Sequence, residues 1–144
     1  MPLDYASVEA LRRTHPAWRL LAAEHAPLIV SFLHASFLVP NVRSLPEQEL
    51  VGKLDDHLFH LRERFGPKEF PRTAAQYLES WAGDAHGWLR RYYAADRDEP
   101  WYDLTPATEK AITWLVSLEQ RQFVGTESRL VIVFELLRQI AEGT

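Results

Sequence analysis

The sequence contains no cysteine, one methionine and only six glycines among its 144 residues. The absence of cysteine excludes disulfide bonds and thiolate metal sites, and it agrees with a reducing compartment. With so few glycines there is no glycine-rich loop to hold phosphate groups, and no Gly-x-Ser-x-Gly motif is present. The longest apolar run, residues 28–39, is shorter than the ~20 residues that span a bilayer, and the first residues lack the pattern of a secretory signal. We therefore expect a cytoplasmic protein without membrane segments.

The composition is that of an ordinary globular protein, with 47% hydrophobic and 25% charged residues. The length predicts one domain, or one domain with an appended helical piece. The formal net charge of −4 disfavours a surface designed as a whole for nucleic acid. Five tryptophans, five tyrosines and seven phenylalanines are present, and such side chains build cores but are also enriched at protein–protein contacts.

Capping residues and prolines predict a series of helices in the first half of the chain. Asp4 is positioned to cap a short first helix, and Pro16 and Pro27 fall at the start of the next two. Two stretches, Ser44–Glu47 and Thr73–Gln76, have the spacing of a capping box. The predicted helices run from residues 4 to 13, 15 to 25, 28 to 38, 44 to 65 and 73 to 83.

A β-hairpin is predicted at residues 88–93 and 101–104, where aromatic residues flank a polar turn. Two further helices are expected after it, at 106–119 and from Thr126 onward, joined by residues 123–127. The fold class is therefore mainly α with one β-hairpin. This order predicts a winged-helix-like domain over residues 1–105, followed by additional helices in residues 106–144 that begin a helical region continuing in a longer protein.

The last predicted helix is more apolar than a single covered face requires. Leu130, Phe134, Leu137 and Ala141 form one stripe at 100° per residue, and Ile132 and Leu136 widen it. The apolar arc then covers roughly 200°, about twice what a surface helix needs. We expect a partner or a further part of a longer protein to cover the rest.

No catalytic, cofactor-binding or metal-binding residues are predicted, and the chain is not expected to be an enzyme. Asp56, His57 and His60 have a spacing compatible with chelation, but no third or fourth ligand follows at a recognisable distance. The carboxylate pairs at residues 55–56 and 98–99 fit a solvated helix face and a turn better than general acid–base chemistry.

Two functional classes remain open, of which the first is a winged-helix DNA-binding module. Its candidate phosphate contacts are Arg90, Arg91 and Arg97 in the predicted hairpin. Residues 83–105 carry more acidic than basic residues, and the helix at 73–82 contains no lysine or arginine. A major-groove helix without basic residues is unusual.

The second class is a protein-interaction domain, and the surplus of apolar and aromatic residues favours it. Its candidate interface residues lie on a charged helix face, in the hairpin and on the last helix. They are Phe59, Trp88, Tyr92, Tyr93, Trp101, Ile132, Leu136 and Ile140.

Several segments resemble the N-terminal region of the Wadjet JetA family, the MukF-like (MksF-type) kleisin of bacterial condensin-related SMC complexes. Two blocks carry most of the resemblance: Asp-Leu-Thr-Pro-Ala-Thr-Glu-Lys at 103–110 and Phe-Val-Gly-Thr-Glu-Ser-Arg-Leu at 123–130. Shorter matches occur at residues 11–21, 25–28 and 31–34. Together they extend from about residue 11 to the end of the sequence.

The resemblance implies a winged-helix dimerisation domain followed by helices that engage an SMC coiled coil. It implies a homodimer, an SMC (MukB-like) subunit and a KITE (MukE-like) subunit as partners in a longer protein, and contact with DNA mainly through the complex. Such assemblies extrude DNA loops and restrict circular plasmids, with ATP hydrolysis and cleavage performed by other subunits. The family has no catalytic motif in this region, and no cofactor is implied.

Overall fold

In a computed structural model of the chain, the backbone is described for residues 3–142 and the side chains for residues 3–120 and 133–141. The chain divides into two units, Met1–Ala111 and Ile112–Thr144. The first unit contains the short helices and a small antiparallel sheet, and the second consists of one helix.

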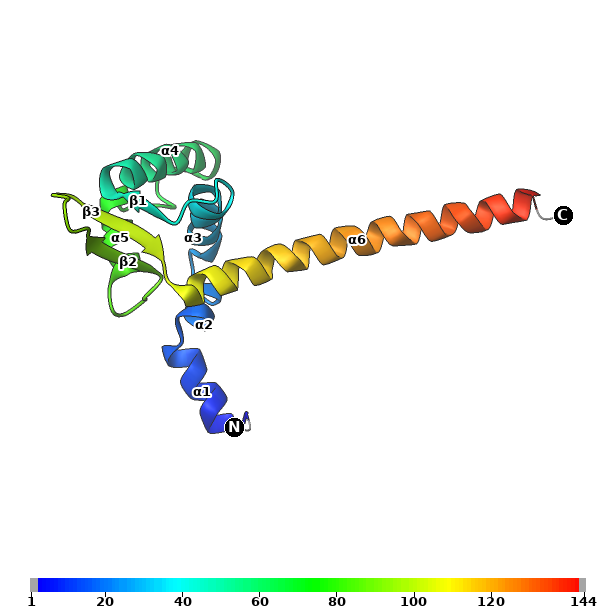
Figure 1. Cartoon of the computed structure of the whole chain (residues 1–144), viewed down its shortest axis with the longest axis horizontal. Helices are drawn as coiled ribbons and strands as arrows, with labels where there is room; N and C mark the ends of the chain where they lie inside the picture. Colours follow the sequence, from blue (N-terminus) through cyan, green and yellow to red (C-terminus); the bar gives the residue numbers. More distant parts are fainter. Residues whose placement is uncertain (1–2, 143–144) are drawn as a thin grey trace. The chain divides into compact units, whose positions relative to one another are not determined.

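Three short helices and a π-helical turn begin the first unit: α1 (Tyr5–Thr14), α2 (Pro16–Leu21), α3 (Ala26–Leu33) and η1 (His34–Leu38). The Asp4 side chain accepts a hydrogen bond from the Ser7 backbone N–H at 2.8 Å, as the capping pattern predicted. His15 caps α2 through its ring Nδ1, which accepts from the Ala17 N–H at 3.1 Å. Figure 1 shows these elements in blue and cyan.

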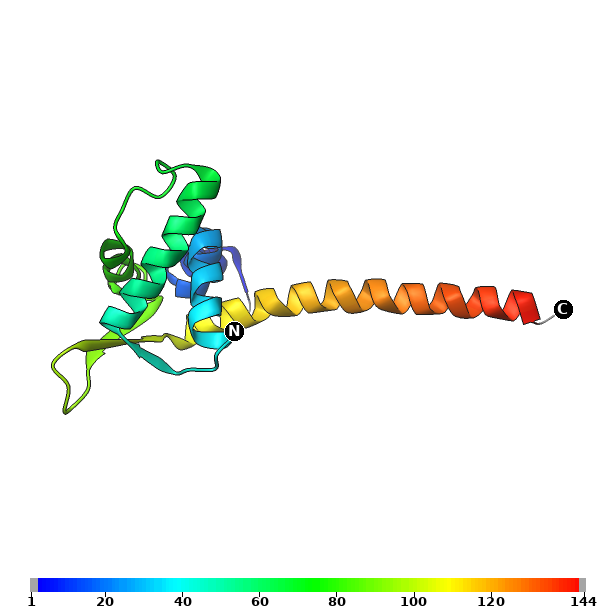
Figure 2. The same cartoon turned by 90° about the horizontal axis from the view of Figure 1, so that it is seen from above.

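The remaining elements of the first unit are β1 (Ser44–Pro46), α4 (Glu47–Phe65), α5 (Ala74–Ala82), β2 (Leu89–Tyr93) and β3 (Pro100–Leu104). The strands form an antiparallel sheet in the order β1-β3-β2. α4 contacts β1 and β3 while α5 contacts α4 and β2, so the two helices cover the sheet (Figure 2). The element order of a winged helix is a helix, a short strand, two helices and a hairpin. The prediction of a mainly α fold with a β-hairpin is confirmed.

The strand β1 was not predicted, because its sequence resembles a capping box. Ser44 does not cap α4: it pairs with Asp103 in the sheet, and its hydroxyl lies 2.8 Å from the Tyr92 hydroxyl. α4 instead begins after Pro46, which provides no side-chain cap. The free edge of β3 offers backbone hydrogen bonds to residues 44–46, and this pairing outweighs the local capping signal.

The core lies between the helices and the sheet. Residues Leu50, Leu54 and Leu58 recur every fourth position along α4 and are fully buried, as the amphipathic pattern of this helix requires. α4 ends at Phe65, and the following Gly66 adopts a positive φ of 103°, a conformation that glycine tolerates best. Other large buried side chains come from α2, α3, α5, β2 and β3, among them Leu20, Leu28, Phe32, Leu33, Leu78, Trp81, Leu89 and Tyr102.

The helix α6 (Pro106–Glu142) runs without interruption through residues 123–127, where the sequence predicted a connection between two helices. That prediction was wrong. Thr126 has the character of an N-cap residue and Gly125 precedes it, but no proline follows to end the helix. One interior glycine costs about 1 kcal/mol relative to alanine, which a helix of this length tolerates. The division between the two units falls within this helix, between Ala111 and Ile112.

The capping box of α5 provides a first test of the fold. Thr73 Oγ1 accepts from the Gln76 N–H at 3.2 Å, and the Gln76 side chain accepts from the Thr73 N–H at 3.0 Å. We expect Thr73→Ala to lower the free energy of unfolding by about 1 kcal/mol, because it leaves a helix N–H without this partner. Urea denaturation of the wild type and of Thr73→Ala measures the difference. An unchanged midpoint would contradict the capping role.

Candidate protein-interaction site

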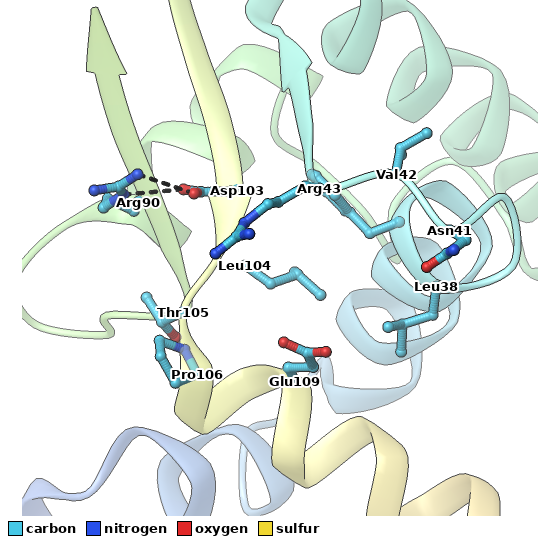
Figure 3. Close-up of a pocket in the computed structure, with 11 residues that line it drawn as sticks. Leu38, Asn41, Val42, Arg43, Arg90, Asp103, Leu104, Thr105, Pro106 and Glu109 are labelled. Atoms are coloured by element: carbon cyan, nitrogen blue, oxygen red, sulfur yellow. Dashed lines mark hydrogen bonds and ion pairs between the residues drawn. The ribbon is translucent and has the colours of Figure 1, made fainter. Parts of the chain in front are cut away.

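The predicted DNA-contact arginines of the hairpin are engaged within the protein. Arg90 forms two hydrogen bonds to the Asp103 carboxylate, at 3.1 and 3.0 Å (Figure 3). Its guanidinium lies 4.4 Å from the centre of the Tyr92 ring. Asp103 raises the pKa of Arg90 further through its hydrogen bond and its charge. Arg91 lies 3.3 Å from the Glu47 carboxylate. A DNA phosphate would have to displace these carboxylates.

The third of these arginines, Arg97, lies over the Trp101 ring at 4.8 Å from its centre. α5, the helix in the position of a winged-helix recognition helix, carries no lysine or arginine, and its exposed positions include Gln76 and Glu79. The charges of the hairpin and of α5 therefore disfavour direct reading of DNA by this surface.

Trp88, a predicted interface residue, belongs to the core instead. Its side chain is 3% exposed, and its indole N–H donates to the Pro16 carbonyl at 3.0 Å. The ring stacks on His86 at 4.4 Å between ring centres. Trp88 directly precedes β2 and its ring is directed toward α2, so it is not available to a partner.

The other aromatic candidates differ in exposure. Tyr92 and Trp101 are half-buried in the sheet, and the Tyr92 hydroxyl contacts Ser44. Tyr93 on β2 is 59% exposed and Phe59 on α4 is 58% exposed. Phe59 packs edge-on against the neighbouring His60 ring. Tyr93 and Phe59 are the two members of this group that a partner can reach.

The part of α6 between Val133 and Ala141 presents a continuous exposed apolar face. Its five large apolar side chains are between 49% and 68% exposed. At 100° per residue they fall within one half of the helix circumference, while Glu135, Arg138 and Gln139 occupy the other half. We call this surface the α6 face; it consists of Val133, Phe134, Leu136, Leu137 and Ile140.

Two of the predicted interface residues, Leu136 and Ile140, belong to the α6 face. The side chain of Ile132, the third candidate on this helix, lies outside the described residues. Glu135 and Arg138 form an ion pair at 3.8 Å on the opposite side. The described segment is thus amphipathic, with its apolar side in contact with solvent.

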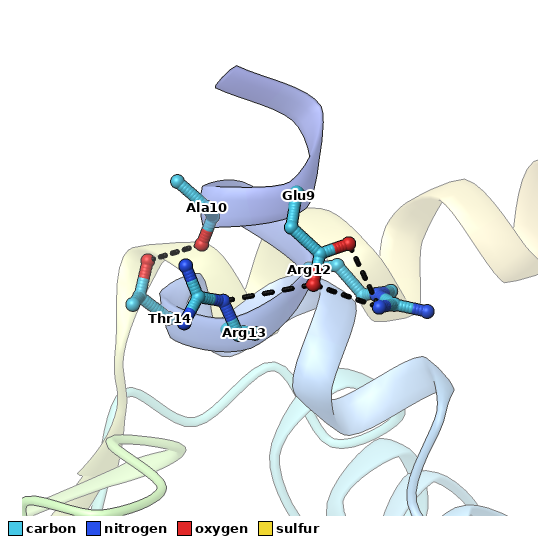
Figure 4. Close-up of polar contacts among 5 residues, drawn as sticks. All are labelled: Glu9, Ala10, Arg12, Arg13 and Thr14. Carbon is cyan, nitrogen blue, oxygen red and sulfur yellow. Dashed lines mark hydrogen bonds and ion pairs between the residues drawn. The ribbon is translucent and has the colours of Figure 1, made fainter. Parts of the chain in front are cut away.

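A second apolar surface lies on α1 and α2. No side chain of α1 is buried, and the helix is held by local polar contacts: Glu9 pairs with Arg12 and Arg13, and the Thr14 hydroxyl donates to the Ala10 carbonyl (Figure 4). An open groove of about 450 Å³ follows these helices. It is lined by Leu11, His15, Ala17, Trp18, Leu21 and Ala22.

A pocket of about 630 Å³ lies between the start of α6, the end of β3 and the loop after η1. Figure 3 shows Arg43 entering it from that loop and Glu109 from the first turn of α6. Both oxygens of Asp103 are occupied by Arg90, so this carboxylate is committed to an ion pair. The pocket is lined by charged side chains of both signs and by apolar side chains. No histidine, cysteine or serine that would act as a nucleophile or base is among its lining residues.

His57 lies next to a serine but lacks the rest of a catalytic arrangement. Its Nε2 is 3.1 Å from the Ser31 hydroxyl, which also donates to the Leu28 carbonyl at 3.2 Å. Among the described residues no carboxylate is hydrogen-bonded to the His57 ring. The contact joins α3 to α4. Within the described part of the chain, no three histidine, aspartate or glutamate side chains are close enough to hold a metal ion.

The lowered pKa values of two histidines predict that the protein loses stability in mild acid. Burial lowers the pKa of His57 and of His86 below the usual 6.5, with the charges of His60 in the first case and of Arg19 and Arg72 in the second as further causes. The unfolded chain therefore binds these protons first, so the stabilisation is complete above pH ~6.5 and is lost as pH falls toward the folded pKa values. We expect the urea midpoint to fall between pH ~7.5 and ~5.5. In the double variant His57→Asn, His86→Asn, we expect the urea midpoint to depend much less on pH. A midpoint that falls with pH as steeply in the variant as in the wild type would contradict this prediction.

A smaller pocket of about 290 Å³ lies between α2, α3, α5 and the turn before β2. Tyr77, which is 6% exposed, lines it, and its hydroxyl is buried without a hydrogen-bond partner in the described part of the chain. The same is true of His86 Nδ1. Further polar side chains that line this pocket are those of Arg72, Ser80, His25 and Glu24. We call it the Tyr77 pocket.

The sequence indicated neither this pocket nor the groove on α1 and α2. Tyr77 was predicted as an ordinary member of the α5 helix, and His86 lies in a turn with no motif around it. Both polar atoms become significant only when the fold brings residues 24–29, 71–81 and 86–88 together. For the groove a local signal did exist, because Leu11 and Trp18 are large apolar residues on helices too short to bury them.

No helix in the described part of the chain combines the length and the apolar character needed to cross a membrane. Comparison with known proteins finds similarity over almost the whole chain. A Mycolicibacterium smegmatis protein described as an uncharacterised protein is 47% identical over 142 residues, which cover 99% of this chain and 30% of that protein. The chain thus spans about a third of the length of this relative. The family model described as "Protein of unknown function (DUF3375)" matches residues 10–144, and the chain therefore belongs to this family.

Proposed function

We propose that this chain is a non-catalytic interaction domain that forms homodimers and acts as the N-terminal domain of a kleisin-type subunit in a bacterial SMC complex. The observation that carries the proposal is the α6 face, a set of five large apolar side chains exposed on one side of a helix. Contiguous exposed apolar surface of this kind is typical of interaction sites. The winged-helix order of elements and the resemblance of the blocks at 103–110 and 123–130 support the kleisin part of the proposal.

The size of the α6 face sets the expected strength of the dimer. Covering a half-exposed leucine, isoleucine or phenylalanine gains roughly 1 kcal/mol, so two copies of the face gain on the order of 10 kcal/mol. Association costs about 4–15 kcal/mol in lost freedom of motion. At the low end of this cost the net gain is about 6 kcal/mol, which corresponds to a dissociation constant of tens of micromolar. We therefore expect a weak dimer that forms in the high micromolar range, and a tighter one only where further surface contributes.

The proposed partners follow from the kleisin assignment. They are a second copy of this chain, an SMC subunit and a KITE subunit of the longer protein's complex, with DNA bound mainly by the complex. The proposal places the protein in the cytoplasm, associated with the nucleoid or with plasmids through that complex. Loop extrusion and plasmid restriction are then activities of the whole assembly rather than of this domain.

Light scattering over a range of concentrations tests the proposal. We expect the mass to rise from that of one chain to that of two as the concentration reaches the high micromolar range. A mass that stays at one chain throughout would contradict homodimerisation.

The alternative, a winged-helix DNA-binding module, makes a different prediction. It requires affinity for duplex DNA that falls steeply with salt and is weakened in the double variant Arg90→Ala, Arg91→Ala. Tight, salt-dependent DNA binding by a monomer would favour this alternative over the interaction domain.

A further inference from the structure

The Tyr77 pocket combines buried polar atoms that lack partners with aromatic walls. A buried hydroxyl or ring nitrogen without a hydrogen bond costs folding free energy, and most such groups in proteins are satisfied. Here two occur in one pocket, the Tyr77 hydroxyl and His86 Nδ1. Each is held in place by packing: the Tyr77 ring lies 5.9 Å from the Trp81 ring, and His86 stacks on Trp88 with 18° between the rings.

Neighbouring interactions fix the backbone around these two groups. The Arg19 guanidinium donates to the Ala85 carbonyl, directly before His86. The Trp88 N–H donates to the Trp81 carbonyl at 3.0 Å, which ties the turn before β2 to α5. On the other side of the pocket, Arg62 donates to the Arg72 carbonyl at 2.7 Å. The arrangement is therefore built before any ligand arrives, which reduces the entropic cost of binding.

The charges around the pocket favour an anion with a single negative charge. Arg72 is a lining residue and carries a positive charge. Burial lowers the pKa of His86, and the charges of Arg19 and Arg72 lower it further. Arg72, Ser80 and Tyr77 carry hydrogen-bond donors and are among the residues that line the pocket. Glu24 is also a lining residue and is exposed, so it repels a doubly charged anion more strongly than a singly charged one.

The size and the walls favour a small ligand with an apolar body. The volume of about 290 Å³ lies at the lower end of the range for small-molecule sites. Trp81, Trp88 and Ile29 form much of the wall, and each is buried. A flat apolar group can pack against these side chains while its charged group faces the donors.

We propose that the Tyr77 pocket binds a small monocarboxylate with a flat apolar body, an activity separate from dimerisation. The Tyr77 hydroxyl donates a hydrogen bond to the carboxylate, and Arg72 supplies the opposite charge. His86 Nδ1 contributes a second donor in the tautomer that carries its proton on this nitrogen.

The experiment titrates the whole chain with benzoate, acetate and inorganic phosphate. Binding is followed by tryptophan fluorescence, because Trp81 and Trp88 line the pocket, and by the thermal shift that a ligand of the folded state produces. We expect saturable binding of benzoate that is tighter than that of acetate, since acetate lacks the apolar body, and tighter than that of phosphate.

The variants separate binding from folding. Tyr77→Phe removes one unpartnered hydroxyl, so we expect unchanged or higher stability and benzoate affinity lower by on the order of tenfold. Tyr93→Phe makes the same change at an exposed ring and serves as the matched control, with unchanged affinity. Arg72→Gln, at an exposed side chain, provides a second weakened variant that leaves the core intact.

Three results would overturn the proposal. The first is the absence of saturable benzoate binding at millimolar concentrations. The second is equal affinity of the wild type, Tyr77→Phe and Arg72→Gln. The third is tighter binding of phosphate than of benzoate, which would assign the pocket to a different class of anion. None of these depends on the oligomeric state, so the proposal and homodimerisation fail separately.

Discussion

Replacing Trp88 by alanine is expected to lower the free energy of unfolding by about 3–5 kcal/mol, because it removes a large buried aromatic side chain and leaves a cavity. The ring is 3% exposed, it stacks on His86, and its indole N–H binds the Pro16 carbonyl. Such a loss is a large part of the stability of a typical domain, so much of the variant is expected to be unfolded at ambient temperature. Urea denaturation followed by circular dichroism measures the change.

Trp114→Ala is the matched control for this experiment. It removes the same side chain from a position that is 51% exposed on α6, and we expect a much smaller effect on the midpoint. If Trp88 were instead an interface residue, as the sequence suggested, Trp88→Ala would leave the midpoint near that of Trp114→Ala and would weaken self-association. That pair of results would contradict the burial of Trp88 in the core.

Replacing Leu137 and Ile140 together by glutamate is expected to raise the dissociation constant of the homodimer by about 100-fold or more. Both side chains belong to the α6 face and are 57% and 68% exposed. In a dimer they would be buried, and an unpaired carboxylate is strongly disfavoured in an apolar contact. Sedimentation velocity over a range of concentrations measures the constant, and circular dichroism verifies that the helix content is retained.

Gln139→Glu adds a carboxylate to the polar side of the same helical turn and serves as the control. We expect this variant to dimerise like the wild type. If the double variant dimerises as tightly as Gln139→Glu, the α6 face is not the contact, and the exposed Tyr93 and Phe59 become the residues to change next.

Local signals were sufficient to predict much of the fold. The Thr73–Gln76 capping box, the Asp4 cap and the glycine after Phe65 depend on residues three or four positions apart, and each is found where expected. The hairpin was also predicted correctly, because its aromatic strands and polar turn are adjacent in the sequence.

The two errors in the predicted elements have a common cause, since each involves competition between a local signal and a longer element. Ser44 has the right neighbours for a cap, but the edge of β3, more than fifty residues away, pairs with it instead. Gly125 and Thr126 resemble a helix end and start, yet the backbone of α6 continues through both. No pattern of neighbouring residues decides which alternative has the lower free energy.

The candidate sites were predictable to different degrees. Helical periodicity alone identified Leu136, Ile140 and the rest of the apolar stripe, because an excess of apolar residues on one helix is visible in the sequence. Periodicity did not distinguish the buried Trp88 from the exposed Tyr93, since the depth of a strand residue depends on what covers it. The Tyr77 pocket was not predictable, because its groups come from separate helices and a turn.

Cysteine scanning tests most directly whether the α6 face joins two copies of this chain, because the sequence contains no cysteine. Single cysteines are introduced in turn at each position from Val133 to Ala141, so that any disulfide must join two chains. The yield of disulfide-linked dimer is then measured after mild oxidation. If the α6 face is the dimer contact, the yield peaks at positions of the α6 face and is low at Glu135, Arg138 and Gln139. Uniformly low yields, or a maximum on the polar side, would contradict this contact.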